Sequence, residues 1–426
     1  GNAGSFTRIA GGVKDAADSI PGWKGYDNSL TAGEFAGGWG RTVIALAPSN
    51  QNILYVMVEN ADDAAAGKPE ADLFKCNMAT TPFTWTKSDT LVAQRKTSSA
   101  TTSRYMELQG GYNMLLGVHP NNSDLVLAGG VNLFRSLDGF ATKDNSSFIG
   151  GVASTTYTDA DGASHADNHS FAFDPTNPNK VLIASDGGIG QIKDITTPGV
   201  EWSLGSSQYQ TLQYYHVGID PTTGSRNYYG GAQDNSTTFR DKSGILGPAI
   251  SDSNDHYIVL GGDGCQVGMT KKNTAGNQFL FCAAQSGQMY RMKLFDFSTG
   301  LYTLIRPTGS ADGEFITYFH LDPDNTDFLY YVSKNSIYRT GDAEKVSTSS
   351  WTLMDGVNTS VTGSIFALAT TRGPYAANNH LFIGTSTGKI YRLKDPQWGA
   401  SGNQPFDITP SGMTSGSVVK DISVNP

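Results

Sequence analysis

The stretch FAFDPTNPNKVLIASDGG (171–188) decides the fold of this chain of 426 residues. Two apolar runs, FAF and VLIA, flank a turn rich in Asp, Pro and Asn, and the second run ends in small residues. Branched and aromatic side chains suit a pleated, half-buried surface, whereas Asp, Pro and Asn favour tight turns. The stretch therefore predicts two neighbouring antiparallel strands joined at the turn.

The same unit recurs along the whole chain. Its copies begin at Val43, Leu115, Phe171, His216, Gln266, Tyr318 and Phe366. From the turn at 48 to the last turn at 426, seven steps average 54 residues. A short third strand such as SIYRT (336–340), and then a fourth strand bearing Trp or Phe, follow most copies. A period near 50 built only from strands predicts an all-β propeller with four-stranded antiparallel blades.

Seven complete copies predict seven blades, and the partial copy at the end leaves eight blades as an alternative. We expect an outer strand at Ser5–Ile9 and an extension within 1–39, followed by a single propeller over 40–426. The final stretch 417–426 is expected to be a strand that closes the ring or begins a truncated blade. The blades are expected to start near residues 43, 113, 169, 214, 264, 316 and 364.

The composition limits the classes of partner and the cellular location that we expect. Charged residues make up 16%, the formal net charge is −9, and no Lys/Arg cluster occurs, so nucleic acid and anionic membranes are poor partners. No apolar run approaches eighteen residues, so no membrane span is expected. Low charge with abundant Gly, Ser, Thr and Asn favours an exported protein. The start GNAGSF, without Met, is typical of a processed or recombinant product.

Three cysteines are present, and two of them flank an apparent hairpin. Cys265 and Cys282 lie on either side of the turn KKNTAGN (271–277), so they are expected to face each other across two strands. Either a disulfide joins them, if the register is right, or they are two buried thiols. Cys76 has no partner and is predicted to lie in the core.

Four polar motifs are expected to meet on one rim. In an antiparallel blade the start of the first strand and the end of the second lie on the same face. That face receives HADNH (165–169), SDGG (185–188), AQDN (232–235) and GGDG (261–264). It would gather Asp167, Asp186, Asp234 and Asp263. Such carboxylates repel one another, so a cation, acid–base catalysis or the capping of tight loops by backbone N–H groups must accommodate them.

The rim also offers candidate metal and ligand sites. If HADNH is extended, His165, Asp167 and His169 share a face and suit a transition metal. Calcium would instead take oxygens from Asp167, Asp186 and Asp234, and the alternative to both is hydrogen bonding between loops. A divalent cation is thus an open expectation and no other cofactor is indicated. The further ligand-binding candidates on the rim are Trp39, Arg41, Glu59, Gln233, Asn235, Gln285, Asp312 and Glu314.

Several of these motifs resemble a known group of propellers. The turn SLDGFAT (136–142) is similar to the Asp-box pattern S-x-D-G-G-x-T-W, but Phe140 departs from it and no Trp follows. The series over 165–189, 213–235 and 261–264 resembles the secreted bacterial BNR-repeat, glycosyl-hydrolase-like propellers, and GGWGR (37–41) is similar to the start of their first blade. They belong to the BNR/Asp-box superfamily of sialidases, xyloglucanases and sortilin-type receptors. The resemblance covers about 40–426 and implies a bacterial extracellular or cell-surface location, but no established reaction.

Two main functions compete. The first is a non-catalytic propeller that binds a glycan or a secreted or surface protein through its acidic rim. The second is a glycoside hydrolase, xyloglucanase-like or active on another polysaccharide, with a carboxylate pair drawn from Asp167, Asp186, Asp234 and Asp263. A sialidase is disfavoured because arginines are sparse near these loops, and a xyloglucanase usually pairs two propellers. A structural role in a larger secreted assembly is the remaining alternative.

Overall fold

The structure is a computed structural model in two compact units, which we describe separately: unit 1 (residues 1–211) and unit 2 (residues 212–426). It describes residues 40–59, 71–81, 83–88, 106–142, 144–151, 158–159, 163–204, 212–242, 244, 256–294, 302–373, 379–396, 404–413 and 416–425. The predicted outer strand Ser5–Ile9 and the extension within 1–39 lie outside these residues.

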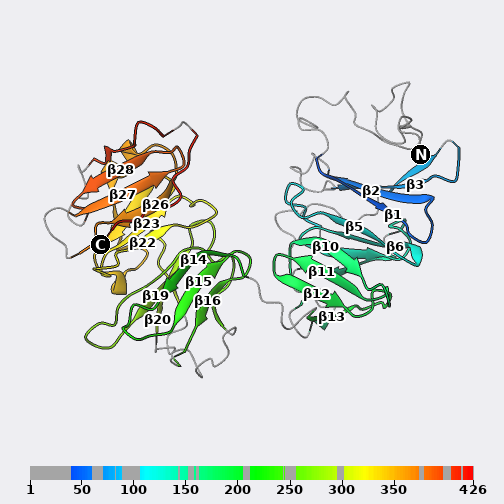
Figure 1. The fold of residues 1–426 in the computed structure, drawn as a ribbon, viewed down its shortest axis with the longest axis horizontal. Coiled ribbons are helices and arrows are strands. Elements are labelled where there is room, and N and C mark those ends of the chain that lie inside the picture. Colours follow the sequence, from blue (N-terminus) through cyan, green and yellow to red (C-terminus); the bar gives the residue numbers. More distant parts are fainter. Residues whose placement is uncertain are drawn as a thin grey trace. The chain divides into compact units, whose positions relative to one another are not determined.

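Unit 1 contains three antiparallel sheets, each built from consecutive strands (Figure 1). The first sheet is β1 (Thr42–Leu46), β2 (Ile53–Glu59), β3 (Ala71–Asn77) and β4 (Thr84–Ser88). The second is β5 (Leu115–His119), β6 (Asn122–Gly129), β7 (Leu133–Ser136) and β8 (Ser146–Gly150). The third is β10 (Asn168–Phe173), β11 (Val181–Ser185), β12 (Gly188–Ile192) and β13 (Glu201–Leu204), with a short parallel strand β9 (Thr158–Asp159) beside β13.

Unit 2 contains four more sheets of the same kind. They are β14 (Tyr214–Ile219), β15 (Tyr228–Ala232), β16 (Thr237–Arg240) and β17 (Tyr257–Leu260); β18 (Val267–Met269), β19 (Phe279–Ala283), β20 (Met289–Lys293) and β21 (Thr303–Leu304); β22 (Phe319–Leu321), β23 (Leu329–Ser333), β24 (Ser336–Thr340) and β25 (Thr352–Leu353); and β26 (Ile365–Thr370), β27 (His380–Thr385), β28 (Ile390–Lys394) and β29 (Phe406–Asp407). The short helix α1 (Asp355–Ser360) follows β25. No helix in the described part of the chain is long and apolar enough to cross a membrane.

The fold class is therefore all-β, a seven-bladed β-propeller, as predicted. The first strand of each blade begins within three residues of its expected start. Within each unit these first strands contact one another, β1 with β5 and β5 with β10, then β14 with β18, β18 with β22 and β22 with β26. That the seven blades form one closed ring stays a prediction.

The core lies between neighbouring blades, because both faces of a blade are apolar. Along β19, Leu280 and Cys282 point into the cluster shared with the preceding blade. Phe279, Phe281 and Ala283 alternate with them and point into the cluster shared with the following blade. This two-residue alternation is what a strand packed on both sides requires.

The Asp of the repeated turn closes that turn with its own side chain. Asp174 Oδ1 accepts hydrogen bonds from the amide of Thr176 at 2.8 Å and from its hydroxyl at 2.7 Å. In the same way Asp220 accepts from the amide of Thr222, and Asp322 from the amide of Asp324. Bonds from Thr176 lower the pKa of Asp174, so this Asp is ionised and stabilises the turn.

The turn over 136–142 is closed by Asp138 in the same manner. Its carboxylate accepts the amides of Ala141 and Thr142, each at 3.1 Å, and the amide group of Asn145 at 3.0 Å. Burial alone would raise the pKa of Asp138, but hydrogen bonds led by Thr142 and Asn145 outweigh it and lower the pKa. Phe140, which departs from the Asp-box pattern, is fully buried with a positive φ of 59°.

The cysteines are three buried free thiols, so the second alternative for Cys265 and Cys282 is the one observed. The amide of Cys265 donates to the carbonyl of Ala283, whereas the amide of Ala283 donates to the carbonyl of Gln266. Cys265 and Gln266 thus both lie opposite Ala283, which is the arrangement of a β-bulge. The bulge turns Cys265 to the opposite face of the sheet from Cys282, and the two side chains lie in different core clusters.

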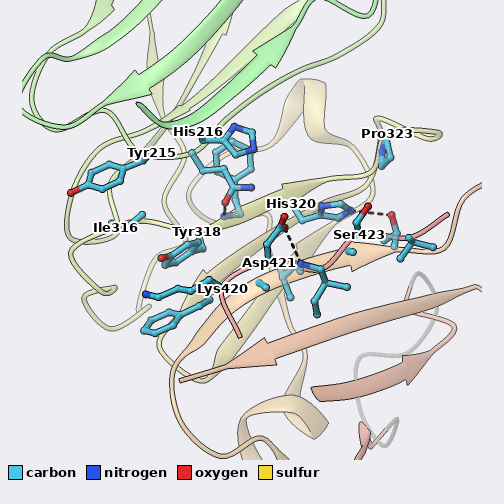
Figure 2. A pocket seen from close by; sticks show the side chains of 18 of the residues that line it. Tyr215, His216, Ile316, Tyr318, His320, Pro323, Lys420, Asp421 and Ser423 are labelled. Carbon is cyan, nitrogen blue, oxygen red and sulfur yellow. Dashed lines mark hydrogen bonds between the residues drawn. The ribbon is translucent and has the colours of Figure 1, made fainter. Parts of the chain in front are cut away.

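The chain end runs along unit 2 without joining a sheet. The described residues 416–425 form no strand, unlike the strand expected at 417–426. Val419 donates one backbone hydrogen bond to the carbonyl of Thr385 at 3.0 Å and packs over Gly384, where a side chain would collide with it. Residues 420–424 then border a cavity of about 510 Å³, together with first strands of the blades in unit 2 (Figure 2).

Candidate functional site

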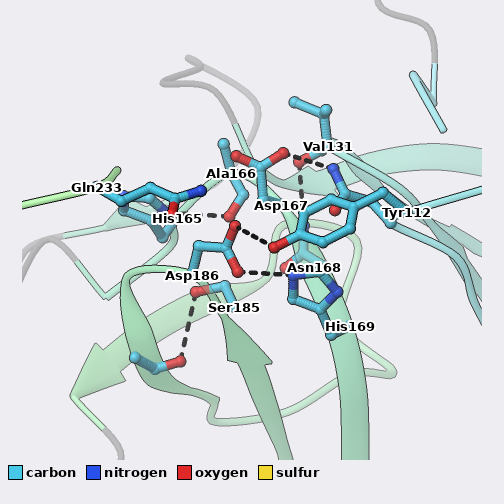
Figure 3. Close-up of polar contacts among 12 residues, drawn as sticks. Tyr112, Val131, His165, Ala166, Asp167, Asn168, His169, Ser185, Asp186 and Gln233 are labelled. Atoms are coloured by element: carbon cyan, nitrogen blue, oxygen red, sulfur yellow. Dashed lines mark hydrogen bonds and ion pairs between the residues drawn. The ribbon is translucent and has the colours of Figure 1, made fainter. Parts of the chain in front are cut away.

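Three segments of unit 1 bring polar side chains together (Figure 3). They are the loop before β5, the segment before β10 and the turn between β11 and β12. Antiparallel pairing places them at one edge, since the chain enters β5 and β10 there and leaves β11 there. We call this group the unit-1 cluster, and it consists of Tyr112, Asn113, Asp167, His169 and Asp186.

Asp186 links three members of the cluster. His169 Nε2 lies 2.7 Å from Asp186 Oδ1, and the Tyr112 hydroxyl donates to Asp186 Oδ2 at 3.4 Å. The rings of Tyr112 and His169 meet edge to face with centroids 4.9 Å apart. The His169 and Asp186 side chains are only 30% and 17% exposed, so the pair is partly shielded from water. The carboxylate of Asp186 is therefore held by two side chains of the cluster.

Asp167 is the second carboxylate of the cluster, and its environment differs from that of Asp186. It has a positive φ of 62°, and its Oδ1 accepts a hydrogen bond from the side chain of Asn113. An oxygen of Asp167 lies within 4.8 Å of an oxygen of Asp186. Burial raises the pKa of Asp167 and the charge of Asp186 adds to the rise, while the bond from Asn113 opposes it. Folding thus favours the protonated form of Asp167.

Arg41 and Glu59 hold the loop that carries Tyr112. Arg41 Nη1 donates to the carbonyls of Gly111 at 2.9 Å and Tyr112 at 3.1 Å. The amide of Arg41 donates to Glu59 Oε2 at 3.0 Å. Gly111 has a φ of 78°, and a side chain there would come within 2.7 Å of that Glu59 oxygen. Arg41 therefore holds the Tyr112 loop directly, and Glu59 accepts the amide of Arg41 and lies close to Gly111.

The other two predicted carboxylates, Asp234 and Asp263, lie in unit 2, where the carboxylate of Asp263 caps backbone. The amide of Asp234 donates to Asp263 Oδ1 at 3.0 Å, and the amide of Asp263 donates to Gln285 Oε1 at 3.1 Å. The side chain of Asn235 donates to the carbonyl of Gln233 at 2.9 Å. For Asp263 the structure thus shows the loop-capping alternative. That the pair in unit 1 and the pair in unit 2 share one rim stays a prediction, as does a divalent cation bound by both.

The remaining candidates have partners of their own. Arg306 Nη2 donates to Asp312 Oδ1 at 2.8 Å, with the Asp312 side chain 82% exposed. Glu314 accepts from the hydroxyl of Ser364 at 2.5 Å. Trp39 lies outside the described residues. These contacts give Asp312 a surface ion pair and give Glu314 a bond between two blades.

The proposed metal triad of His165, Asp167 and His169 is not gathered. Strand β10 begins only at Asn168, and the left-handed backbone of Asp167 breaks the alternation that would align the three side chains. His169 pairs with Asp186, whereas the ring of His165 packs over Gly187, at 2.3 Å from where a side chain would begin. Among the described residues, no group that could hold a metal includes either histidine.

Sequence reasoning missed Tyr112 and Asn113. They lie in GGYN (110–113), directly before the first strand of the second blade, which is the position that HADNH occupies in the third. That shared position is a usable signal.

Comparison with known proteins adds structural neighbours at low identity. No protein family matches the chain, and no curated protein matches it. A GH74 xyloglucanase from Xanthomonas campestris is similar in structure at 12% identity and a TM-score of 0.40, over 85% of this chain and 55% of that one. An ancestral GH74 enzyme is similar at 14% identity and a TM-score of 0.47, over 84% of this chain and 50% of that one. Sqt1 from Chaetomium thermophilum is similar at 14% identity and a TM-score of 0.32, over 84% of this chain and 83% of that one. The chain spans about half the length of these two GH74 enzymes.

The opposite pKa directions of Asp167 and Asp138 predict opposite effects of the same substitution. A carboxyl whose pKa is raised by folding loses stability as the pH rises above about 4, so Asp167→Asn should raise the unfolding midpoint at pH 7. Asp138 has a lowered pKa, so Asp138→Asn should cost about 1–2 kcal/mol at pH 7, and less near pH 3. Urea denaturation at both pH values measures this. Equal destabilisation by both substitutions would contradict the assignment.

Removing the Arg41 side chain should loosen the Tyr112 loop. Arg41→Ala deletes two hydrogen bonds from a charged donor, which costs about 2 kcal/mol. Amide hydrogen exchange measured by mass spectrometry should show faster exchange over 108–113. Lys345→Ala serves as the control because its ion pair with Asp342 is largely exposed and contributes little. Unchanged protection of the loop in Arg41→Ala would refute the positioning role.

Proposed function

We propose that the protein is an exported propeller that binds glycans through the unit-1 cluster. The observation that carries this is the Tyr112 ring, which is 52% exposed and is held beside two carboxylates and an imidazole. A single exposed aromatic ring is common on protein surfaces, so what distinguishes Tyr112 is that its ring lies beside polar groups that can bind hydroxyl groups. Its apolar face suits the C–H face of a sugar, while its hydroxyl stays bonded to Asp186.

The polar members of the cluster supply the hydrogen bonds that a sugar needs. The oxygens of Asp167 and Asp186 accept bonds from hydroxyl groups, and charged acceptors make such bonds about twice as strong as neutral ones. Arg41 fixes the loop beforehand, so little conformational entropy is lost on binding. The low charge and polar composition of the chain support export and a location outside the cell or on its surface.

The second candidate function is glycoside hydrolysis at the same cluster. The approach of Asp167 to Asp186 within 4.8 Å favours it, because retaining enzymes keep their carboxyl groups about 5–5.5 Å apart. In that reading Asp167, with its raised pKa, protonates the leaving oxygen. Asp186 attacks the anomeric carbon, the bond to the leaving oxygen breaks, and water then releases the sugar with Asp167 as base.

Glycan binding should depend on the cluster. In a glycan array followed by calorimetry with the best oligosaccharide, Tyr112→Ala and Asp186→Asn should each weaken binding about tenfold or more, since central contacts cost over 1 kcal/mol when removed. Tyr302→Ala, which removes an exposed aromatic ring of unit 2, should leave the affinity unchanged. Equal affinity for all variants, or no glycan bound, would refute the proposal.

Hydrolysis is tested separately with chromogenic glycosides and polysaccharides. If the chain is a hydrolase, Asp167→Asn should lower kcat at least about a hundredfold while Tyr112→Ala mainly raises KM, because proton transfer typically contributes 10²–10⁴-fold. Glycan binding without turnover of any substrate would leave the binding function and exclude the enzymatic one.

A further inference from the structure

Two first strands of unit 2, β14 and β22, each carry an aromatic residue followed by a histidine, and the proposed function does not use them. Tyr215 and His216 lie on β14, with His216 four residues before the turn residue Asp220, and Phe319 and His320 lie on β22, with His320 two residues before the turn residue Asp322. All four border the cavity of about 510 Å³, which lies within the size range of ligand sites (Figure 2). Neither histidine has a role in turns or in the core clusters.

The lining offers aromatic surface. Tyr318 and Phe366 come from neighbouring blades, and their ring centroids lie 5.5 Å apart. Lys420 covers one ring, with its Nζ 4.2 Å from the centroid of Phe366. Because Lys420 is exposed and belongs to the strandless end segment, it is a removable cover rather than part of the core.

The lining also offers hydrogen-bonding groups with capacity to spare. His216 Nδ1 is buried and has no hydrogen-bond partner among the described residues, an arrangement that is costly unless a ligand or water completes it. Gln266 accepts the amide of Phe319 through Oε1, at 3.0 Å, which fixes its side-chain NH₂ as a donor at the cavity wall. His320 Nε2 is already bonded to the hydroxyl of Thr370 at 3.0 Å.

The lining carries charges of both signs. Arg372 is held by Asp324 through two bonds, at 2.8 and 3.1 Å, and Lys420 precedes Asp421. Burial lowers the pKa of His216, and it lowers that of His320 to about 4, with Asp421 and Asp322 respectively opposing the shift. Both imidazoles are therefore neutral at pH 7. Because cationic and acidic groups both border the cavity, an ion of either sign would meet a like charge as well as an opposite one, and an apolar ligand would leave His216 Nδ1 unpaired.

We propose that this cavity binds a neutral, polyhydroxylated ligand of one or two sugar units, which lies against Phe366 and Tyr318 and hydrogen-bonds to His216 and Gln266. The site is separate from the unit-1 cluster and does not depend on it. It gives unit 2 a binding function of its own, built from the inner strands rather than from the loops.

The test is calorimetry of the full chain with maltose, cellobiose, lactose and xylobiose as neutral probes, and with glucuronate and choline as charged ones. At least one neutral disaccharide should bind saturably and the charged probes should not. His216→Phe, which keeps a ring but removes both nitrogens, and Phe366→Ala should each weaken binding about tenfold. Tyr112→Ala leaves this binding unchanged, which separates it from the glycan site of unit 1.

Lys420→Ala provides a variant that does not threaten folding, because its side chain is exposed. It uncovers the Phe366 ring and should strengthen binding several-fold, opposite to the other variants. Circular dichroism checks the fold of each variant, and where Phe366→Ala unfolds the chain, Lys420→Ala and His216→Phe decide. Absence of binding by every neutral probe, tighter binding of a charged probe, or affinities that ignore these substitutions would overturn the proposal.

Discussion

Antiparallel pairing of consecutive strands is the constraint on which the rest of the structure depends. Because the chain reverses at each turn, the segment before a first strand and the turn after a second strand meet at one edge. In unit 1 this brings Asp167 to Asp186, which are nineteen positions apart in sequence. In unit 2 it brings Asp263 to Asp234. Most strand residues are used for packing between blades, so the loops at that edge are free to carry polar side chains.

Aspartate serves two opposite purposes on this scaffold. In the repeated turns the carboxylate accepts backbone amides, and the pKa of Asp174 and Asp220 is lowered. In the unit-1 cluster the carboxylates are bonded to side chains, and burial raises the pKa of Asp167. The first arrangement stabilises the fold at neutral pH, and the second destabilises it there. Asp167 lowers the stability of the fold, whereas the turn aspartates raise it. This difference marks a functional position better than residue type alone does.

The sequence was sufficient to predict the blades but not every side-chain direction. Strand and turn signals are local, so the starts of all seven blades could be located to within three residues. The predicted side-chain directions are wrong wherever the backbone departs from the regular alternation of a strand. A bulge beside Cys265 sends its thiol away from Cys282, and the positive φ of Asp167 separates His165 from His169. Neither irregularity has a sequence signal strong enough to recognise, since both depend on loops packed from distant parts of the chain.

Tyr112 and the cavity of unit 2 escaped prediction for a different reason. A carboxylate in a loop is a candidate site residue on its chemistry alone, whereas an aromatic residue in a propeller usually belongs to the core. The distinction becomes visible only through exposure and partners, as with Tyr112 at 52% exposure and Phe366 beneath Lys420. Position within the repeat supplies what residue type does not. GGYN matches HADNH in place, whereas His216 and His320 stand at different distances from the turns of their blades. Comparing blades position by position therefore separates residues that every blade needs from those that only some blades carry.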